Sequence, residues 1–600
     1  MKTPIMDRRN LDFLLYEMLG ADKLTEWPAF ADHSRETFDA VIDLAHQLAM
    51  DKFLPHNRKS DLNEPVFENG RVTIIPEVKQ ALDAYIEAGF MGATTPADQG
   101  GMQLPFLIDT AASGAFATAN VATFAYVILA RGVANLISAH GDDEQKRRYR
   151  DPILQGRFYG TMCLSEPQAG SSLADIRTRA TPQQDGSYLL DGAKMWISGG
   201  EHELGENIVH MVLARLPDAP AGVRGISLFL VPKFHVNDDG SLGERNDVLL
   251  AGVNHKMGYR GTVNTFLKFG ENGHCRGWLV GQANQGLACM FHMMNEARIG
   301  VGQGAVMLGN AGYLHSLEYA RERRQGRLPD QKGADSEPVA LIEHADVKRM
   351  LLQQKCYVEA PYALALYGAR LVDQKTHSRD DRTSNEAALL LELLTPIIKA
   401  WPSDWCLKAN ELAVQILGGY GYTREYPVEQ FYRDNRLNPI HEGTNGIQAM
   451  DLLGRKAMMQ NGAALALLVE RIQETIAGCA GQQDLEAHAG SLGGYLQLAS
   501  KTTAVLGGEM ASGNVRLALA NASHYMTLVG HIVMAWMLLE QARIAAAALP
   551  AAEGEDVAFY EGKLIACDFF FRHELPIIEH SAALLTSLDD TTLRAVPDNF

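Results

Sequence analysis

The sequence predicts an α+β protein in which helical regions flank one central β region. Apolar residues recur with helical spacing up to about residue 155 and again from about residue 287. Between these regions, short β-type runs are separated by turn-forming pairs such as Asp185-Gly186 and Asp239-Gly240. Strands grouped together, rather than alternating with helices, indicate segregated elements and not a doubly wound parallel sheet.

A chain of 600 residues is too long for one hydrophobic core. We expect four regions: an N-terminal helical domain (1–158), a central small β-barrel or sandwich (159–280), a C-terminal helical bundle (281–460) and an additional helical domain (461–600).

Individual elements follow from local patterns. A helix should cover Phe38 to Ala49 with Ser34 as its N-cap, and a second should begin after Pro76. The Ala-rich stretch 106–139 predicts closely packed helices, and the runs 208–213 and 226–231 predict strands. Helical spacing returns at about residue 287, after which the Gly- and Pro-containing segment 325–338 is expected to be a surface loop.

Composition narrows the functional classes. The net charge of −18 opposes nucleic acid and anionic membranes as partners. Seven scattered cysteines without a C-x-x-C pair argue against disulfides and zinc and favour the cytoplasm, and we expect no bound metal. The most apolar stretch, Tyr525 to Leu539, is about fifteen residues long, which predicts a buried helix rather than a membrane span.

Two familiar motifs lack their structural context. Gly300 to Ala305 satisfies the dinucleotide fingerprint G-x-G-x-x-A, but no strand pattern precedes it, so close helix packing explains these small residues better. His441-Glu442 has no second histidine at metal-binding spacing, and a Gly-x-Ser-x-Gly elbow is absent from the sequence.

Three other segments can carry chemistry. They are the hydroxyl-rich segment 163–171 (CLSEPQAGS), the strand 194–200 (KMWISGG) and the segment 422–448, which includes PVEQFYRDN and IHEGTNGIQ. Small residues and hydroxyls in an irregular loop can present backbone N–H donors to a polar ligand. Taken singly, however, these segments could equally be a turn, a core tryptophan and an acid near a helix N-terminus.

In their joint order, the three segments resemble the acyl-CoA dehydrogenases, with a Ser/Thr-Glu-Pro-x-Ala-Gly-Ser loop, a Lys-x-Trp-Ile-Ser/Thr strand and a Gly-Gly-x-Gly to Glu-Gly-Thr run. The resemblance covers residues 38–456. The remaining C-terminal block resembles the extension of larger bacterial members, which include fatty acyl-CoA and 3-methylmercaptopropionyl-CoA dehydrogenases.

The resemblance implies non-covalent FAD held between the β domain and the second bundle. It implies Glu442 as the base that removes the α-proton of an acyl-CoA, with hydride passing from the β-carbon to flavin N5. Some relatives place the base just before the arginine that corresponds to Arg298, but here that residue is Ala297, and Glu296 lies about 100° around the helix.

The resemblance also assigns binding residues by position. Those assigned to FAD are Met162, Leu164, Ser165, Gly170, Ser171, Trp196, Ser198, Arg323, Gln415, Gly418, Gly419, Thr444 and Gly446. Those assigned to substrate are Ser171, Arg298 and Gly443. In relatives, the stretch that corresponds to Gln415–Gly419 comes from the neighbouring subunit.

Several positions depart from the family pattern. No Phe follows Arg323 at the usual spacing, and Ala345 replaces a common Gln, and both changes lie in the adenine half of the site. His441 replaces a frequent Tyr before the base, while Ser165 in place of Thr keeps the hydroxyl.

The expected function is FAD-dependent conversion of acyl-CoA to trans-2-enoyl-CoA in fatty acid β-oxidation, with a medium- to long-chain acyl group. Electron-transfer flavoprotein is the expected acceptor and a homodimer the expected assembly. An acyl-CoA oxidase and a 3-methylmercaptopropionyl-CoA dehydrogenase are the alternatives. A nucleic-acid-binding relative, like the alkylation-response flavoproteins, fits poorly because the block 462–600 is acidic.

Overall fold

The computed structural model describes residues 5–331, 333 and 336–600, which form two compact units. We call them the helical unit (1–39, 105–114 and 298–600) and the β unit (40–104 and 115–297). Three helices contain residues of both units: α2 (Arg35–Leu48), α5 (Phe106–His140) and α8 (Gly286–Glu322). Our division of the chain into four domains remains a prediction.

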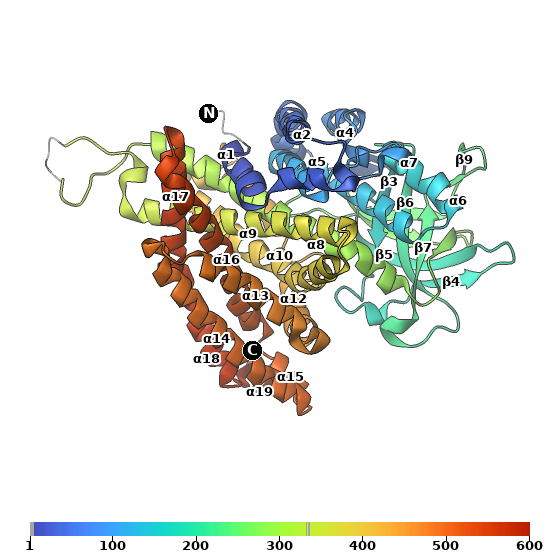
Figure 1. Cartoon of the computed structure of the whole chain (residues 1–600). Coiled ribbons are helices and arrows are strands. Elements are labelled where there is room, and N and C mark those ends of the chain that lie inside the picture. Colours follow the sequence, from blue (N-terminus) through green and yellow to red (C-terminus); the bar gives the residue numbers. More distant parts are fainter. Residues whose placement is uncertain (1–4, 332, 334–335) are drawn as a thin grey trace. The chain divides into compact units, whose positions relative to one another are not determined.

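The β unit is built on an eight-stranded sheet in the order β10-β11-β5-β12-β7-β6-β3, with β4 pairing with both β5 and β6. That double pairing closes β5, β12, β7, β6 and β4 into a ring, so of the two β architectures expected, a barrel or a sandwich, the strands form a small barrel. Figure 1 shows the strands of this unit in cyan and green. The strands are β3 (Phe158–Cys163), β4 (Arg179–Pro182), β5 (Tyr188–Ser198), β6 (Asn207–Arg215), β7 (Ile226–Pro232), β10 (Val248–Val253), β11 (Asn264–Phe269) and β12 (Arg276–Val280). Two separate hairpins are β1 (Val66–Glu68) with β2 (Arg71–Thr73) and β8 (Phe234–Val236) with β9 (Leu242–Arg245).

Helices of the β unit pack through aromatic side chains. The rings of Phe53 and Tyr85 each lie 4.9 Å from the ring of Phe116, at angles of 59° and 76°. The helices are α3 (Asn57–Leu62), α4 (Pro76–Glu87), α6 (Asp143–Gln145) and α7 (Asp151–Leu154), together with parts of α2, α5 and α8.

Helix starts agree with the local signals. The Thr37 N–H donates to Ser34 Oγ at 3.3 Å beside the first turn of α2, and Pro76 begins α4. The stretch predicted to hold several helices is one element, α5, interrupted only at Asn120, whose backbone is non-helical. Asn120 Oδ1 accepts from Thr123 N–H at 3.0 Å and so restarts the helix within the same element.

The helical unit is dominated by the long helices α9 (Ala345–His377) and α10 (Asp381–Leu417), which pack along each other (Figure 1). Figure 1 also shows α14, α16 and α18 packed together in the C-terminal extension, coloured orange to red. The other helices are α1 (Arg8–Asp12), α11 (Val428–Asn435), α12 (Asn445–Asp451), α13 (Ala463–Gly478), α14 (Gln483–Ala511), α15 (Val515–Leu519), α16 (Ala522–Ala548), α17 (Glu555–Phe569), α18 (Ile577–Thr586) and α19 (Thr591–Arg594). The predicted α+β class is confirmed.

The glycine pattern at Gly300–Ala305 lies inside α8. A Cβ at Gly302 would collide with the Ile398 carbonyl oxygen on α10, so this glycine permits close contact of two helices. The nucleotide-fingerprint interpretation is therefore excluded by the absence of a preceding strand in this part of the described chain.

Two helices in the described part of the chain are long and apolar enough to cross a bilayer, Phe106–His140 and Ala522–Ala551. In each, 61% of the most apolar window is buried within the fold. Burial of this extent is typical of core helices, and the second includes the stretch that was predicted to be one.

A buried ionic cluster joins the C-terminal extension to the rest of the helical unit. Lys563 on α17 donates to Glu359 on α9 (2.8 Å), Gln541 on α16 (2.9 Å) and Asn10 on α1 (2.5 Å), and Lys355 also pairs with Glu359. Burial disfavours the Glu359 carboxylate, but the two lysines outweigh burial and lower its pKa to about 2. The Lys563 ammonium thus links four helices, and Glu359 is the acid that balances its charge.

Glu359→Gln should therefore destabilise the helical unit by about 3–5 kcal/mol, because the buried Lys563 and the partly buried Lys355 lose their only carboxylate in the cluster. Since the folded pKa lies below the ordinary 4.5, the contribution is present at neutral pH and disappears as the pH falls toward about 2. Denaturant unfolding followed by tryptophan fluorescence measures the change. Glu411→Gln, which removes the exposed pair with Lys408, is the control and should cost less than about 1 kcal/mol; equal effects would contradict the cluster's role.

Candidate active site

Glu442 lies in the bend between α11 and α12, in the helical unit. Its φ is +53° and that of Gly443 is +84°, so two consecutive residues adopt the left-handed conformation. A non-glycine residue there is strained, and such strain persists only where the surroundings hold it. The φ of Gly443 favours glycine, and an added Cβ would also lie 2.6 Å from Gln448 Nε2 and displace that amide.

Three side chains, Gln448, Thr444 and Lys399, hold this turn through four hydrogen bonds. Gln448 Nε2 donates to the Glu442 carbonyl at 3.0 Å, and Thr444 Oγ1 accepts from Ile447 N–H at 3.3 Å as the N-cap of α12. From α10, the buried Lys399 ammonium donates to the Gly443 carbonyl at 2.8 Å and to Asn445 Oδ1 at 2.9 Å. The backbone that carries Glu442 is therefore fixed by α12, which follows it, and by α10.

The environment of the Glu442 carboxyl opposes its ionisation. Burial raises the pKa of Glu442, while the positive charges of Arg298 and Lys399 partly offset this effect. Burial lowers the pKa of the adjacent His441 to about 3, so this imidazole is neutral at pH 7. A carboxyl of raised pKa near two cations is suited to accept a proton at neutral pH.

Arg298 lies on α8 and is 5% exposed. Its guanidinium is 3.5 Å from Asp451, but its buried Nε has no hydrogen-bond partner among the described residues. An unpartnered buried donor indicates space for an acceptor from a ligand. Glu296, the other acid near this position, belongs to the β unit, where it accepts from Asn135 Nδ2 at 3.2 Å.

In the β unit, one ion pair explains why two of the motifs occur together. Lys194 on β5 donates to the Leu164 carbonyl at 3.0 Å and to Glu166 at 2.9 Å, and both charged groups are buried. Glu166 also accepts from the backbone N–H of Arg177 and Thr178. Burial opposes ionisation of Glu166, but these partners lower its pKa to about 2.

The loop that follows β3 contains Glu166 and makes a tight turn, after which its small residues are exposed. Glu166 and Ala169 exchange backbone hydrogen bonds of 2.9 and 3.0 Å, after which Gly170 and Ser171 are exposed. Met162, at the end of β3, and Leu164 and Ser165, which follow that strand, are half-buried. The ion pair between Glu166 and Lys194 thus fixes the loop that exposes Gly170 and Ser171.

Trp196 has an unusual backbone conformation and an unusually high exposure for an aromatic residue in a strand. Its φ is +67°, and 62% of the residue is exposed although it lies within β5. The register opposite β11 shifts between Lys194 and Ile197, so Trp196 occupies a β-bulge. The strand predicted over 194–200 is therefore interrupted by this bulge, and its side chains do not alternate regularly between the two faces. Strained, exposed aromatic residues of this kind are typical of ligand sites.

Ser198, two residues further along β5, accepts at its Oγ from Asn264 Nδ2 at 3.1 Å. Asn264 Oδ1 in turn accepts from Asn254 Nδ2 at 2.8 Å. This chain fixes the direction of the Ser198 hydroxyl. No motif pointed to the two asparagines, because Asn264 meets Ser198 only through the pairing of β11 with β5, and Asn254 meets Asn264 from the end of β10.

A cavity of about 590 Å³ in the helical unit collects four residues assigned to the adenine half of the cofactor. Gly418 and Gly419, in the short 3₁₀ helix Gly418–Tyr422, have open space where a Cβ would be. Exposed Arg323 offers a cation that suits a phosphate. Residues 332, 334 and 335 of the predicted loop 325–338 lie outside the described residues. The lining residues are Tyr319, Arg323, Gln325, Leu341, Val347, Met350, Gln415–Tyr420 and Thr423.

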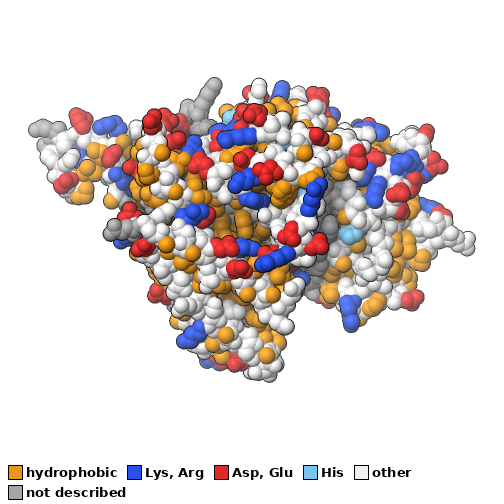
Figure 2. Space-filling view, in the orientation of Figure 1, with side chains coloured by type: hydrophobic (Ala, Val, Ile, Leu, Met, Phe, Trp, Pro, Cys, Tyr) orange, Lys and Arg blue, Asp and Glu red, His pale blue; other side chains and the backbone are white. Residues whose placement is uncertain are grey.

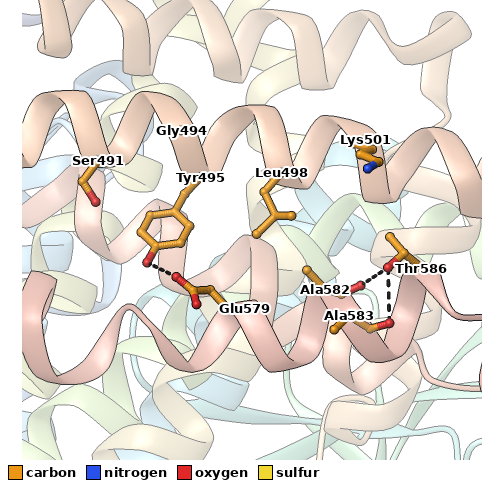
Figure 3. Close-up of a pocket in the computed structure, with 9 residues that line it drawn as sticks. All are labelled: Ser491, Gly494, Tyr495, Leu498, Lys501, Glu579, Ala582, Ala583 and Thr586. Atoms are coloured by element: carbon orange, nitrogen blue, oxygen red, sulfur yellow. Dashed lines mark hydrogen bonds between the residues drawn. The ribbon is translucent and has the colours of Figure 1, made fainter.

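A second cavity, of about 460 Å³, lies between α14 and α18 in the C-terminal extension (Figure 3). Tyr495 points from α14 toward Glu579 on α18 and donates to it at 2.8 Å (Figure 3). None of the residues assigned from the sequence lines this cavity, so we assign it no chemistry.

The described residues contain no cluster of three His, Cys, Asp or Glu side chains arranged for a metal ion. All seven cysteines are buried and form no disulfide.

Each unit thus brings together a distinct part of the assigned set. The helical unit groups Glu442, Gly443, Thr444 and Gly446 in one turn, with Arg298 close enough to influence the pKa of Glu442. Sequence reasoning missed Lys399 and Gln448, which hold this turn. A lysine inside the apolar run 393–402 (LLTPIIKAWP) was the available signal, since such a charge requires a partner.

Family models account for most of the chain. Residues 35–157 match the N-terminal domain, 161–270 the middle domain and 284–458 the C-terminal domain of acyl-CoA dehydrogenase, while residues 468–595 match a model described as acetyl-CoA dehydrogenase C-terminal like. The chain belongs to the acyl-CoA dehydrogenase family. It is therefore an FAD-dependent oxidoreductase that acts on acyl-CoA.

Relatives of similar length extend this result. The chain is 35% identical to 3-methylmercaptopropionyl-CoA dehydrogenase of Ruegeria pomeroyi, over 96% of this chain and 98% of the relative. It is 34% identical to the broad-specificity linear acyl-CoA dehydrogenase FadE5 of Mycobacterium tuberculosis, over 97% of each chain. It is 32% identical to a butyryl-CoA dehydrogenase of Syntrophomonas wolfei, over 95% of this chain and 94% of the relative.

Solved structures share the fold. ACDH-11 of Caenorhabditis elegans in complex with C11-CoA has a TM-score of 0.74 and 17% identity, over 94% of this chain and 90% of that one. An acyl-CoA dehydrogenase of Bacillus anthracis with FAD has a TM-score of 0.72 and 20% identity, over 94% and 93% of the two chains. The matched span includes the C-terminal extension, so this extension is part of the shared fold.

The residues present fit FAD. Trp196 offers an exposed aromatic face of the kind on which a planar ring system can pack. The cavity at Arg323 provides a cation and open glycines, which suit a diphosphate and its adenosine.

Proposed function

We propose that this enzyme dehydrogenates medium- to long-chain acyl-CoA to trans-2-enoyl-CoA in fatty acid β-oxidation, with Glu442 as the α-proton-abstracting base. The observation that carries the assignment is the strained turn at Glu442, held by Lys399 and Gln448, with a carboxyl whose pKa is raised by burial. Strain and a raised pKa at one acid are typical of a catalytic base.

Proton abstraction by Glu442 also requires a hydrogen-bond donor that stabilises the enolate. A thioester α-C–H is a weaker acid than a carboxylic acid by a margin worth about 15–20 kcal/mol, which a lone carboxylate cannot overcome. No group in the described part of the chain accepts a hydrogen bond from the Glu442 N–H. We propose that this N–H donates to the thioester oxygen and stabilises the enolate that forms when Glu442 takes the proton.

Other residues then bind and orient the ligands. We propose that Arg298 and Gly443 contact the thioester end of the substrate, and that Ser171 contacts the CoA arm and the cofactor. FAD, when bound, supplies the acceptor for the two electrons that leave the substrate. The residues proposed to bind it are Met162, Leu164, Ser165, Gly170, Ser171, Trp196 and Ser198 in the β unit, and Arg323, Gln415, Gly418, Gly419, Thr444 and Gly446 in the helical unit.

Chain length is tested by the rate of flavin bleaching with a panel of acyl-CoAs from four to sixteen carbons, together with 3-methylmercaptopropionyl-CoA. We expect the highest kcat/KM with medium to long saturated chains. The 35% identical relative named for the thioether substrate supports the alternative, which a higher kcat/KM for 3-methylmercaptopropionyl-CoA would establish.

We propose electron-transfer flavoprotein as the electron acceptor. One relative, 27% identical, is named as a subunit of a caffeyl-CoA reductase–Etf complex, which supports this choice. With acyl-CoA alone, the enzyme should consume oxygen much more slowly than it reduces added electron-transfer flavoprotein. Oxygen uptake at the full turnover rate would instead identify an acyl-CoA oxidase.

We further propose a homodimer in which the cavity at Arg323 receives the adenine end of FAD bound to the other copy; light scattering with and without FAD tests the assembly. Figure 2 shows acidic and basic side chains interspersed on the face in view, which does not favour a nucleic-acid partner. The buried, unpaired cysteines are compatible with the proposed cytoplasmic location.

A further inference from the structure

Lys399 is a buried charge without an ion-pair partner. It is 0% exposed, and no carboxylate in the described part of the chain forms an ion pair with it. Its ammonium instead donates to two neutral oxygens, the Gly443 carbonyl and Asn445 Oδ1, both in the segment that follows Glu442. Burying an ammonium is unfavourable in free energy, and an apolar residue at this position of α10 would be buried without that penalty. The cation therefore serves something other than packing.

The two oxygens fix the part of the turn that is most strained. Gly443 has φ of +84° and follows Glu442 at +53°, so the Gly443 carbonyl is oriented by two left-handed residues in succession. Asn445, the first residue of α12, is itself held because its Nδ2 donates to the Ala400 carbonyl on α10 at 3.2 Å. Lys399 and Asn445 thus connect α10 to the turn that presents the base.

We propose that Lys399 is the positioning residue of the catalytic base: its ammonium holds the left-handed turn at Glu442–Gly443, and its charge favours the ionised carboxyl that must exist before proton abstraction. The inference rests on the proposed role of Glu442. Lys399 acts through Glu442 and makes no contact of its own with the reacting carbons.

The charged groups near Lys399 and Glu442 determine how removal of the Lys399 charge should change the pKa of Glu442. Arg298 on α8 and Lys399 on α10 face Glu442, and both lower its pKa against the effect of burial. Burial lowers the pKa of Lys399 to about 8, with Asp404 and Glu442 opposing this and Arg298 reinforcing it. The remaining neighbours are His441, neutral at pH 7, and the groups that act on Arg298 and Asp404, which are Asp451, Arg455 and Arg436.

Lys399→Met keeps an unbranched side chain that is one atom shorter and removes its charge and its donors. The rate of flavin bleaching by acyl-CoA depends on ionised Glu442, so it rises with pH through the apparent pKa of the base. In the variant, the midpoint of this rise should move to higher pH by about one unit, because one of two nearby cations is lost. The plateau should fall about 10- to 100-fold through misorientation of the turn, with KM nearly unchanged.

Two variants separate charge from tethering. Gln448→Met removes the other contact to the turn, at the Glu442 carbonyl, and should lower the plateau while leaving the midpoint where it is. Lys399→Arg keeps the charge and should also leave the midpoint in place. Lys563→Met is the matched control, since it removes a buried lysine whose pKa is likewise about 8; it should lower the melting temperature without moving the midpoint.

The outcomes distinguish this inference from the proposal on which it rests. If Lys399→Met keeps the wild-type midpoint and plateau while Glu442→Gln loses bleaching, Glu442 is the base and Lys399 does not position it. If Glu442→Gln bleaches normally, both fail. Should Lys399→Met not yield a folded flavoprotein, Lys399→Gln against Lys399→Arg replaces it, and an equal midpoint in these two variants would overturn the role of the charge.

Discussion

Glu442→Gln should retain bound FAD and lose flavin bleaching by acyl-CoA about 10³- to 10⁴-fold. The amide has nearly the shape of the carboxyl, so the left-handed turn and its contacts to Lys399 and Gln448 remain, and only the ability to accept a proton is removed. Anaerobic stopped-flow absorbance of the bound flavin measures the rate, and the visible spectrum confirms that cofactor content is unchanged.

The control for this variant is Glu296→Gln. Glu296 lies next to the position where some relatives carry the base, but it accepts from Asn135 within the β unit. Its bleaching rate should stay within about threefold of the wild type. A large loss in Glu296→Gln, together with near-normal bleaching in Glu442→Gln, would move the base to α8 and contradict the assignment.

Lys194→Met should have the largest effect on stability and cofactor retention. It leaves the Glu166 carboxylate buried without its cation, which costs about 3–5 kcal/mol. It also removes the hydrogen bond to the Leu164 carbonyl, so the start of the loop that leads to Gly170 and Ser171 is no longer fixed. We expect a lower melting temperature and release of FAD at dilutions where the wild type stays yellow, measured by thermal unfolding and by filtration of free flavin.

Two further variants test the reason for this effect. Lys268→Met removes an exposed pair with Glu271, beyond the end of β11 and within the same unit, and should change stability by less than about 1 kcal/mol. The double variant Lys194→Met with Glu166→Gln should recover part of the loss, because no buried charge is then left unpaired. A double variant less stable than Lys194→Met alone would show that charge compensation is not the cause.

The fold class was predictable because its signals are local. Periodicity located α2 and α4, the Asp-Gly turns separated the strands, and the missing strand before Gly300 excluded a nucleotide fingerprint. Closure of the barrel depends on β4 pairing with both β5 and β6, a tertiary feature that the sequence indicated only as one of two β architectures.

The site was predictable to the extent that its residues lie in short motifs. The resemblance pointed to Glu442, Trp196 and Arg323 because each lies in a recognisable run. The left-handed bulge at Trp196 could not be read from the strand, since it depends on the register opposite β11. Lys399 lies 43 residues before Glu442 in the chain, so its contact with the turn arises only when α10 packs beside α12.

The central claim, that Glu442 exchanges a proton with the substrate α-carbon, is tested most directly by isotope exchange. Enzyme and a saturated acyl-CoA are incubated anaerobically in D₂O without an electron acceptor, and the recovered acyl-CoA is analysed by mass spectrometry for deuterium at the α-carbon. Wild-type enzyme should incorporate deuterium, whereas Glu442→Gln, with FAD bound, should incorporate none above the uncatalysed rate. Incorporation by Glu442→Gln at the wild-type rate would contradict the account.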